Sequence, residues 1–174
     1  MADSGIRFSI AASTAWAPGV ETAEAWLDWS LGQREIAGET EPAVRAMAPM
    51  LRRRAGVLDR MALEVAYRCL GDRTGVPAIF CSRHGETARS VDLLTDLAKG
   101  QPLSPTMFGL SVHNATGGLF SIARGDHAGS SALAAGPSSV EHAVIEACGL
   151  LADGAAEVLL VVYDRPLPAV YAAY

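Results

Sequence analysis

Two hydrophobic patterns alternate along this chain. Short apolar runs of about four to eight residues are typical of buried strands, whereas apolar residues at steps of three and four indicate one face of a helix. The runs predict strands at 6–13, 77–81, 130–134 and 157–163. The periodic stretches predict helices at 22–31, 52–70 and 86–98, a helix of small residues before the strand at 130, and a helix after the turn at 135–139. Strands that alternate with helices predict an α/β fold whose sheet is covered on both faces.

Two helix boundaries have a residue signal of their own. Gly71 and Gly75 follow the helix expected at 52–70 and are expected to end it. Ser138 stands where it can cap the helix after the turn. That helix carries an apolar stripe of Val140, Ala143, Val144, Ala147, Leu150 and Leu151.

Composition narrows the class of protein. Half of the 174 residues are hydrophobic, which predicts one well-filled domain over 1–174. A net charge of −5 gives no general attraction to nucleic acid or anionic membranes. Cys69, Cys81 and Cys148 show no metal or redox spacing, so we expect reduced thiols in a cytoplasmic protein without metal or cofactor. There is no secretory signal pattern and no run of about 18 apolar residues for a membrane helix.

One motif is typical of a class of enzymes, the histidine phosphatases. Arg83-His84-Gly85-Glu86-Thr87 directly follows the strand expected at 77–81. Histidine phosphatases carry such a turn, with a transiently phosphorylated histidine and an arginine that holds phosphate oxygens. Those enzymes place the motif on their first strand and need a second histidine after a much later strand, whereas His113 follows too soon. A phosphatase using His84 is therefore the second hypothesis, and an ordinary strand-to-helix turn is the alternative for this motif.

Seven segments, taken in order, resemble the N-terminal half of the beta-ketoacyl synthases. The resemblance is closer to the short ketosynthase-like proteins of aryl-polyene and related type II pigment clusters. The segments are WAPG at 16–19, MLRRR at 50–54, SRHGE at 82–86, PLSPT at 102–106, SVHNA at 111–115, SIARG at 121–125 and DRPLP at 164–168. The resemblance implies a thiolase-like α/β/α fold with a mixed sheet, of which this chain supplies only the N-terminal half.

The same resemblance implies that the catalytic residues are missing. In an ungapped alignment through 131–140, the nucleophilic cysteine of the family falls on Gly136. Glycine cannot carry an acyl chain, and Ser138 and Ser139 are expected to cap a helix rather than to act as nucleophiles. The histidines that drive condensation belong to the second half of a ketosynthase, which this chain does not include. No catalytic residue is therefore expected.

Without catalytic residues, the role that the resemblance still allows is that of a partner subunit. Chain-length factors are catalytically inactive ketosynthase-like subunits that pair with a full-length ketosynthase and help bound its product tunnel. The resemblance implies such a heterodimer, in which the strand at 130–134 joins its counterpart across the dimer. The residues expected at the partner or tunnel interface are Met107, Phe108, His113, Asn114, Ser130, Ser131, Ala132, Leu133 and Ala134.

Several alternatives stay open. Arg52, Arg53 and Arg54 could dock an acidic acyl carrier protein, which would make that protein an indirect partner, or could form an ordinary solvated face. His113 and Asn114 could instead form a local turn bonded to backbone. The third functional hypothesis is a homodimeric acyl-binding or scaffolding module.

Overall fold

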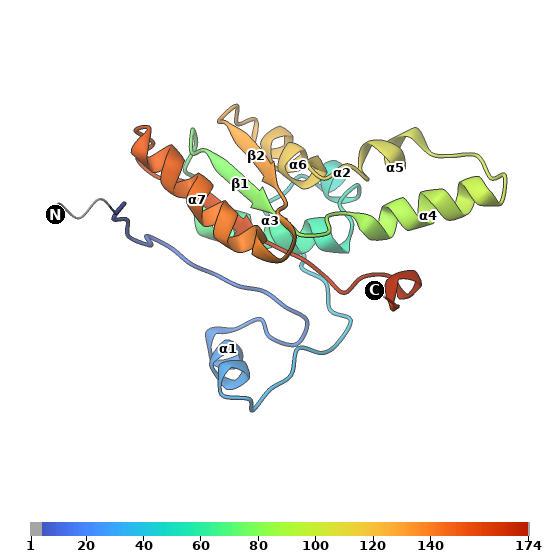
Figure 1. The fold of residues 1–174 in the computed structure, drawn as a ribbon, viewed down its shortest axis with the longest axis horizontal. Coiled ribbons are helices and arrows are strands. Elements are labelled where there is room, and N and C mark those ends of the chain that lie inside the picture. Colours follow the sequence, from blue (N-terminus) through green and yellow to red (C-terminus); the bar gives the residue numbers. More distant parts are fainter. Residues whose placement is uncertain (1–4, 174) are drawn as a thin grey trace. The chain divides into compact units, whose positions relative to one another are not determined.

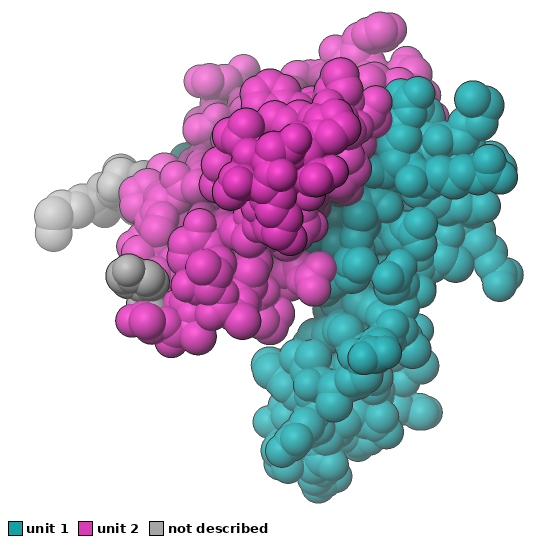
Figure 2. All heavy atoms as spheres, turned by 90° about the vertical axis from the view of Figure 1, so that its right-hand side faces the viewer, with its two compact units in different colours: residues 1–73 teal, residues 74–174 magenta. Residues whose placement is uncertain are grey.

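The structure is a computed structural model that describes residues 5–173. The chain divides into two compact units, Met1–Arg73 and Thr74–Tyr174, which Figure 2 colours teal and magenta. No helix among the described residues is long and apolar enough to cross a membrane.

The first unit is helical. Its helices are α1 (Ala23–Ser30), α2 (Pro49–Arg52) and α3 (Val57–Leu70). Thr22 caps α1, because its hydroxyl accepts a hydrogen bond of 3.2 Å from the amide of Ala25. At the start of α3 the amide of Gly56 donates to the carboxylate of Asp59 over 2.9 Å. Gly71 ends α3 at a φ of 56°, as the sequence predicts.

Two sequence expectations for this unit are wrong. Residues 6–13 form no strand, and Ile6, Phe8 and Ile10 are all exposed. An extended segment becomes a strand only when a neighbour pairs with its amides, and no segment of 5–173 does so here. The helix expected at 52–70 begins only at Val57, because the chain leaves the helical conformation after α2 ends at Arg52 and Gly56 is extended. Glycine is a poor helix former, so it permits this break.

The second unit contains a parallel sheet of three strands in the order β2-β1-β3, of which Figure 1 labels β1 and β2 side by side. Its central strand β1 aligns Ala78 with Ser130 of β2 and with Leu159 of β3. The elements are β1 (Ala78–Cys81), α4 (Thr87–Ala98), α5 (Pro105–Gly109), α6 (Ala115–Arg124), β2 (Ser130–Leu133), η1 (Gly136–Ser138), α7 (Ser139–Ala152), β3 (Leu159–Val162) and η2 (Ala169–Tyr171). The strands predicted at 77–81, 130–134 and 157–163 are thus confirmed within one or two residues.

Helices cover both faces of this sheet. On one face, Ala143 of α7 packs in a core cluster with Ile79 and Cys81 of β1. On the other face, the ring of Phe80 meets that of Phe120 in α6 edge-to-face, with centroids 5.6 Å apart. Alternate residues of β1 therefore face opposite layers, which confirms the predicted α/β/α class. The strands within the described residues are all parallel.

Candidate functional site

The carboxyl ends of the three parallel strands bring three polar segments to one edge of the sheet. Residues 82–86 follow β1, the turn at 134–138 follows β2, and Asp164 follows β3 by two residues. In open α/β sheets this edge is where functional residues gather. All three segments belong to the second unit.

The turn after β2 has a left-handed residue at its centre. Gly136 adopts a φ of 59°, and a Cβ built on it would meet no atom within 4 Å. Ser139 closes the turn, since its hydroxyl accepts from the amide of Ala135 (2.9 Å) and donates to the carbonyl of Gly136 (2.8 Å). Ser138 occupies the cap position of α7 but makes no capping bond with its side chain, so the capping role predicted for it is wrong. The neighbouring Ser139 takes the turn-closing role.

The only thiol of this neighbourhood among the described residues is unreactive. Cys81, at the end of β1, is fully buried, and its Sγ lies 3.3 Å from the carbonyl oxygen of Ser139. Burial raises the pKa of this thiol, and the nearby charge of Asp164 raises it further. A protonated, buried thiol is neither a nucleophile nor an acyl carrier. Cys81 is therefore no substitute for a cysteine at position 136.

Asp164 ties the ends of β1 and β3 together. Its carboxylate accepts hydrogen bonds from the hydroxyl of Ser82 (2.8 Å) and from the amides of Arg83 (2.8 Å) and His84 (3.2 Å). The hydroxyl of Ser82 in turn accepts from the amide of Gly85 over 2.7 Å. The turn after β1 is thus wrapped around a carboxylate.

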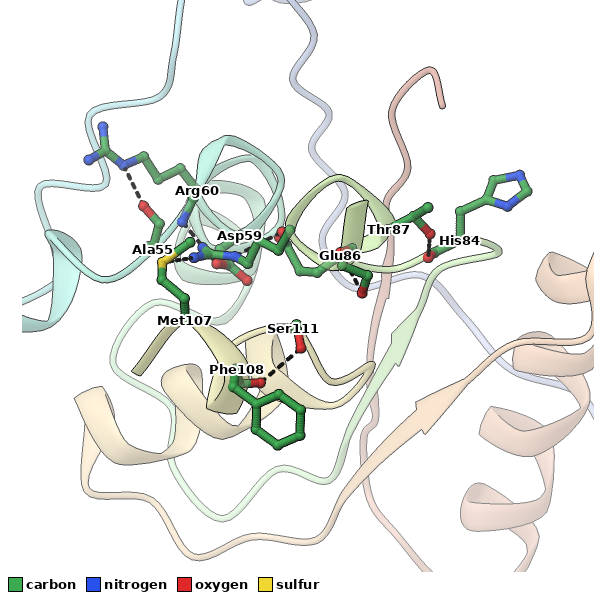
Figure 3. A network of polar contacts seen from close by, with 12 residues as sticks. Ala55, Asp59, Arg60, His84, Glu86, Thr87, Met107, Phe108 and Ser111 are labelled. Carbon is green, nitrogen blue, oxygen red and sulfur yellow. Dashed lines mark hydrogen bonds and ion pairs between the residues drawn. The ribbon is translucent and has the colours of Figure 1, made fainter. Parts of the chain in front are cut away.

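This arrangement does not favour phosphate chemistry at His84. Two amides that could cradle a phosphate already bind the Asp164 carboxylate, whose negative charge would repel a phosphate. The carbonyl of His84 accepts from the hydroxyl of Thr87, and its imidazole points away from that bond (Figure 3). The only other histidine nearby in the described fold, His113, uses its Nε2 on the carbonyl of Ser82 at 2.8 Å.

His113 packs against the turn as well as bonding to it. Gly85 has a φ of 54°, and a Cβ on it would lie 2.9 Å from Cδ2 of His113. Asn114 is the exposed cap residue of α6, and its carbonyl accepts from the amide of Gly118 (3.0 Å). His113 is thus bonded to backbone, but to a carbonyl 31 residues away, and the bond of Asn114 is the first backbone bond of α6 rather than one made by its side chain. An interface role for them stays a prediction.

β2 forms an open edge of the sheet. Its neighbour β1 donates from Ala78 to the carbonyl of Gly129 (2.9 Å), and Ser82 donates to that of Leu133 (3.1 Å). Because residues alternate along a strand, the amides of Ser130 and Ala132 point away from β1. No strand among residues 5–173 pairs with that side, and both residues are exposed.

α5 presents an apolar side chain to solvent. Its N-terminus is capped by Ser104, whose hydroxyl accepts from the amide of Met107 (3.3 Å), and Ser111 donates to the carbonyl of Phe108 (2.8 Å). Met107 and Phe108 point in opposite directions from this helix (Figure 3). Phe108 is 64% exposed.

Residues 26–174 match the family model of the beta-ketoacyl synthase N-terminal domain. The chain belongs to this family. It is also similar to a solved chain of the complex described as "Ketosynthase (ApeO) in Complex with its Chain Length Factor (ApeC) from Xenorhabdus doucetiae". The TM-score is 0.85 at 29% sequence identity, and the match covers 95% of this chain and 70% of that chain. No curated protein matches. The resemblance noted in the sequence is confirmed.

Sequence reasoning missed two polar residues of this ketosynthase-like site. Ser82 and Asp164 were seen only as parts of resembling segments, although each lies at the carboxyl end of an expected strand. Their hydrogen bond joins residues 82 positions apart, which no local pattern reveals. A polar residue directly after each of two parallel strands is the signal that could have found them.

The arginine cluster lies in the first unit. Arg52 ends α2, and its Nη1 lies 3.4 Å from the carbonyl oxygens of both Ala43 and Val44. Arg53 and Arg54 are exposed. Arg52 thus helps to hold a loop, and carrier-protein docking by this cluster stays a prediction.

Proposed function

We propose that this chain is a non-catalytic subunit of the chain-length-factor type. It pairs in the cytoplasm with a full-length beta-ketoacyl synthase of type II fatty-acid, aryl-polyene or polyketide biosynthesis and helps to shape the acyl tunnel of that enzyme. The observation that carries this proposal is Gly136, which stands in a left-handed turn after β2 and, in the ungapped alignment through 131–140, at the position of the family's cysteine. Membership of the family supplies the fold, and the glycine argues against independent condensation.

The chemistry of the turn supports a lack of catalysis. A ketosynthase holds its acyl chain on a thiolate, whereas the thiol near this turn is buried, has a raised pKa and faces a carbonyl. The hydroxyl of Ser139 is engaged on both sides within the turn. An acyl chain would thus find no nucleophile here.

The open edge of β2 supports pairing. Exposed amides of an edge strand are satisfied by a strand from another subunit, and two-fold interfaces commonly use such edges. Ser130 and Ala132 offer this edge with small side chains, which allow close approach. A ketosynthase bound to its chain length factor is also what the similar solved structure contains.

Exposed apolar residues on α5 support a role in the tunnel. Met107 and Phe108 are 36% and 64% exposed, which is unfavourable in water unless another surface or an acyl chain covers them. We assign both to the tunnel wall, together with Asn114 and the half-buried His113. The whole chain, 1–174, acts in this proposal as one domain.

Co-purification tests the proposal directly. The chain is co-expressed with the complete ketosynthase encoded beside it, with an affinity tag on one of the two proteins only. We expect a stable one-to-one complex that has condensing activity only when the ketosynthase supplies its cysteine. A stable homodimer that leaves the ketosynthase behind would refute this function and favour the scaffolding module instead.

A further inference from the structure

A buried ion pair joins Glu86, the last residue of the polar segment 82–86, to Arg89 in the first turn of α4. Nε of Arg89 lies 3.0 Å from Oε2 of Glu86, and the two side chains are only 9% and 8% exposed. Charges so well buried need close partners, because they have lost their hydration. Glu86 therefore helps to fix the position of Arg89.

The same guanidinium reaches α5. Nη1 of Arg89 lies 3.5 Å from the Sδ of Met107, within the range of a weak hydrogen bond to a thioether. One planar group of α4 thus contacts the cap residue Glu86 through Nε and α5 through Nη1. Lysine could not do both, since its ammonium is a single point on a flexible stem.

This contact bears on the direction of Phe108. α5 has only five residues, so little intrinsic helix stability holds it in place. Met107 points towards the polar network and Phe108 points away from it (Figure 3). Fixing Met107 on one side of so short a helix also fixes where the aromatic ring on the other side points.

We propose that Arg89 is a positioning residue that holds α5 through Met107 and thereby sets the place of Phe108 on the tunnel wall. Glu86 acts by orienting Arg89. This inference rests on the proposed function for its consequence, the length of the acyl product. It gives the Glu86 of the Arg83-His84-Gly85-Glu86 motif a role that needs no phosphate chemistry.

The first experiment uses the chain alone and needs no partner. Arg89→Lys keeps the positive charge beside Glu86 but loses the contact with Met107, so amide exchange at 106–111 is expected to rise roughly three- to tenfold. Met107→Leu keeps the side-chain volume and removes the sulfur, and should raise exchange in the same segment. The double variant should add little to either change. Arg83→Lys is the matched control, because Arg83 is exposed and contacts Asp164 only through its amide.

The second experiment uses the complex with the ketosynthase. Arg89→Lys should co-purify as well as the unsubstituted chain, yet shift the product distribution by at least one extension unit. A merely structural role would lower complex yield without moving product length. Unchanged exchange at 106–111 and unchanged products in Arg89→Lys would overturn the inference. If the unsubstituted chain fails to co-purify, the proposed function and the tunnel role fall, while the exchange data still decide whether Arg89 positions α5.

Discussion

At the scale of single residues, Gly136 combines a left-handed backbone conformation with open space where a Cβ would lie. Sharp strand-to-helix turns that carry nucleophiles hold the nucleophile in a strained conformation. Here the φ of 59° is present, but glycine adopts it without the penalty that a Cβ brings. The left-handed turn at Gly136 is thus present without the strain that a side chain would bring.

Gly136→Ala tests this cost. The left-handed conformation is unfavourable for alanine by about 1–2 kcal/mol, so the free energy of unfolding should fall by about that much. Gly149 is the control, because it lies inside α7 with no left-handed backbone and no atom within 4 Å of a built Cβ. Gly149→Ala should raise stability by up to about 1 kcal/mol. Urea unfolding of both variants measures these changes in the free energy of unfolding. Equal effects of the two substitutions would show that the left-handed conformation at position 136 carries no extra cost.

Gly85→Ala should cost more than Gly136→Ala. A Cβ on Gly85 combines a left-handed backbone with a contact of 2.9 Å to the ring of His113. Strain and overpacking together predict a loss of at least about 2 kcal/mol in urea unfolding. In a His113→Ala background the clash is absent, so the additional cost of Gly85→Ala should shrink towards the strain alone. Strict additivity of the two substitutions would show that the ring does not matter.

At the scale of elements, the sequence predicts helices well, because their backbone hydrogen bonds lie within one segment. It fails for the expected strand at 6–13, which needs a neighbouring strand. α1, α4 and α7 carry periodic apolar faces of their own, and all appear close to their expected ranges. Residues 6–13 have the alternation of a strand, yet a strand exists only when another segment accepts its hydrogen bonds. The match of Gly136 to the family's cysteine rests on an alignment and stays a prediction. The bond of Asp164 to Ser82 and the contact of Arg89 with Met107 could not be predicted, because they join residues 82 and 18 positions apart.

Asp126 couples two loops of the second unit and gives a prediction on pH. Its carboxylate accepts from the amides of Gly75 (3.1 and 3.3 Å) and Ala128 (3.0 Å), and these bonds lower its pKa, that from Ala128 most. A carboxyl whose pKa is lower in the folded state stabilises the fold above its unfolded pKa. This stabilisation is lost as the pH falls through the folded pKa.

Asp126→Asn should therefore destabilise the chain at pH 7, and the difference from the unsubstituted chain should narrow steadily as the pH is lowered below about 4. Urea unfolding across this pH range measures it. Asp96→Asn, at an exposed position near the end of α4, controls for the change in net charge. A difference that stays constant with pH would mean that the Asp126 carboxylate does not contribute in this way.

At the scale of the whole molecule, alternate residues of β2 serve different ends. Some hold the fold of the isolated chain, and the others face the open edge where a second subunit can pair. The amide of Ala132 points to that edge, whereas the amide of Ser131 faces β1. A substitution at one position can thus affect pairing alone, and at the next position the fold itself.

Ala132→Pro should leave the isolated chain folded, because proline is tolerated on an edge strand where its missing amide faces outwards. Co-purification with the ketosynthase should be lost, since that amide and the flatness of the edge are needed for pairing. Ser131→Pro removes a bond to β1 and should unfold the chain, and Ala132→Ser keeps the amide and a small side chain and should pair normally. Circular dichroism and tagged co-purification give the two readouts. Normal pairing by Ala132→Pro would move the interface away from β2.

The edge of β2 also bears on how much of this protein a cell can hold. Natural sheets discourage unwanted strands with edge lysines, prolines or bulges, but residues 129–134 are Gly-Ser-Ser-Ala-Leu-Ala and carry neither a charge nor a proline. Copies made in excess of the ketosynthase would have unpaired β2 edges that can pair with one another. Strong overproduction of the chain by itself should therefore raise the share found in inclusion bodies, and balanced synthesis of both subunits should lower it. The open edge of β2 thus links the amount of this subunit that stays folded to the amount of its partner.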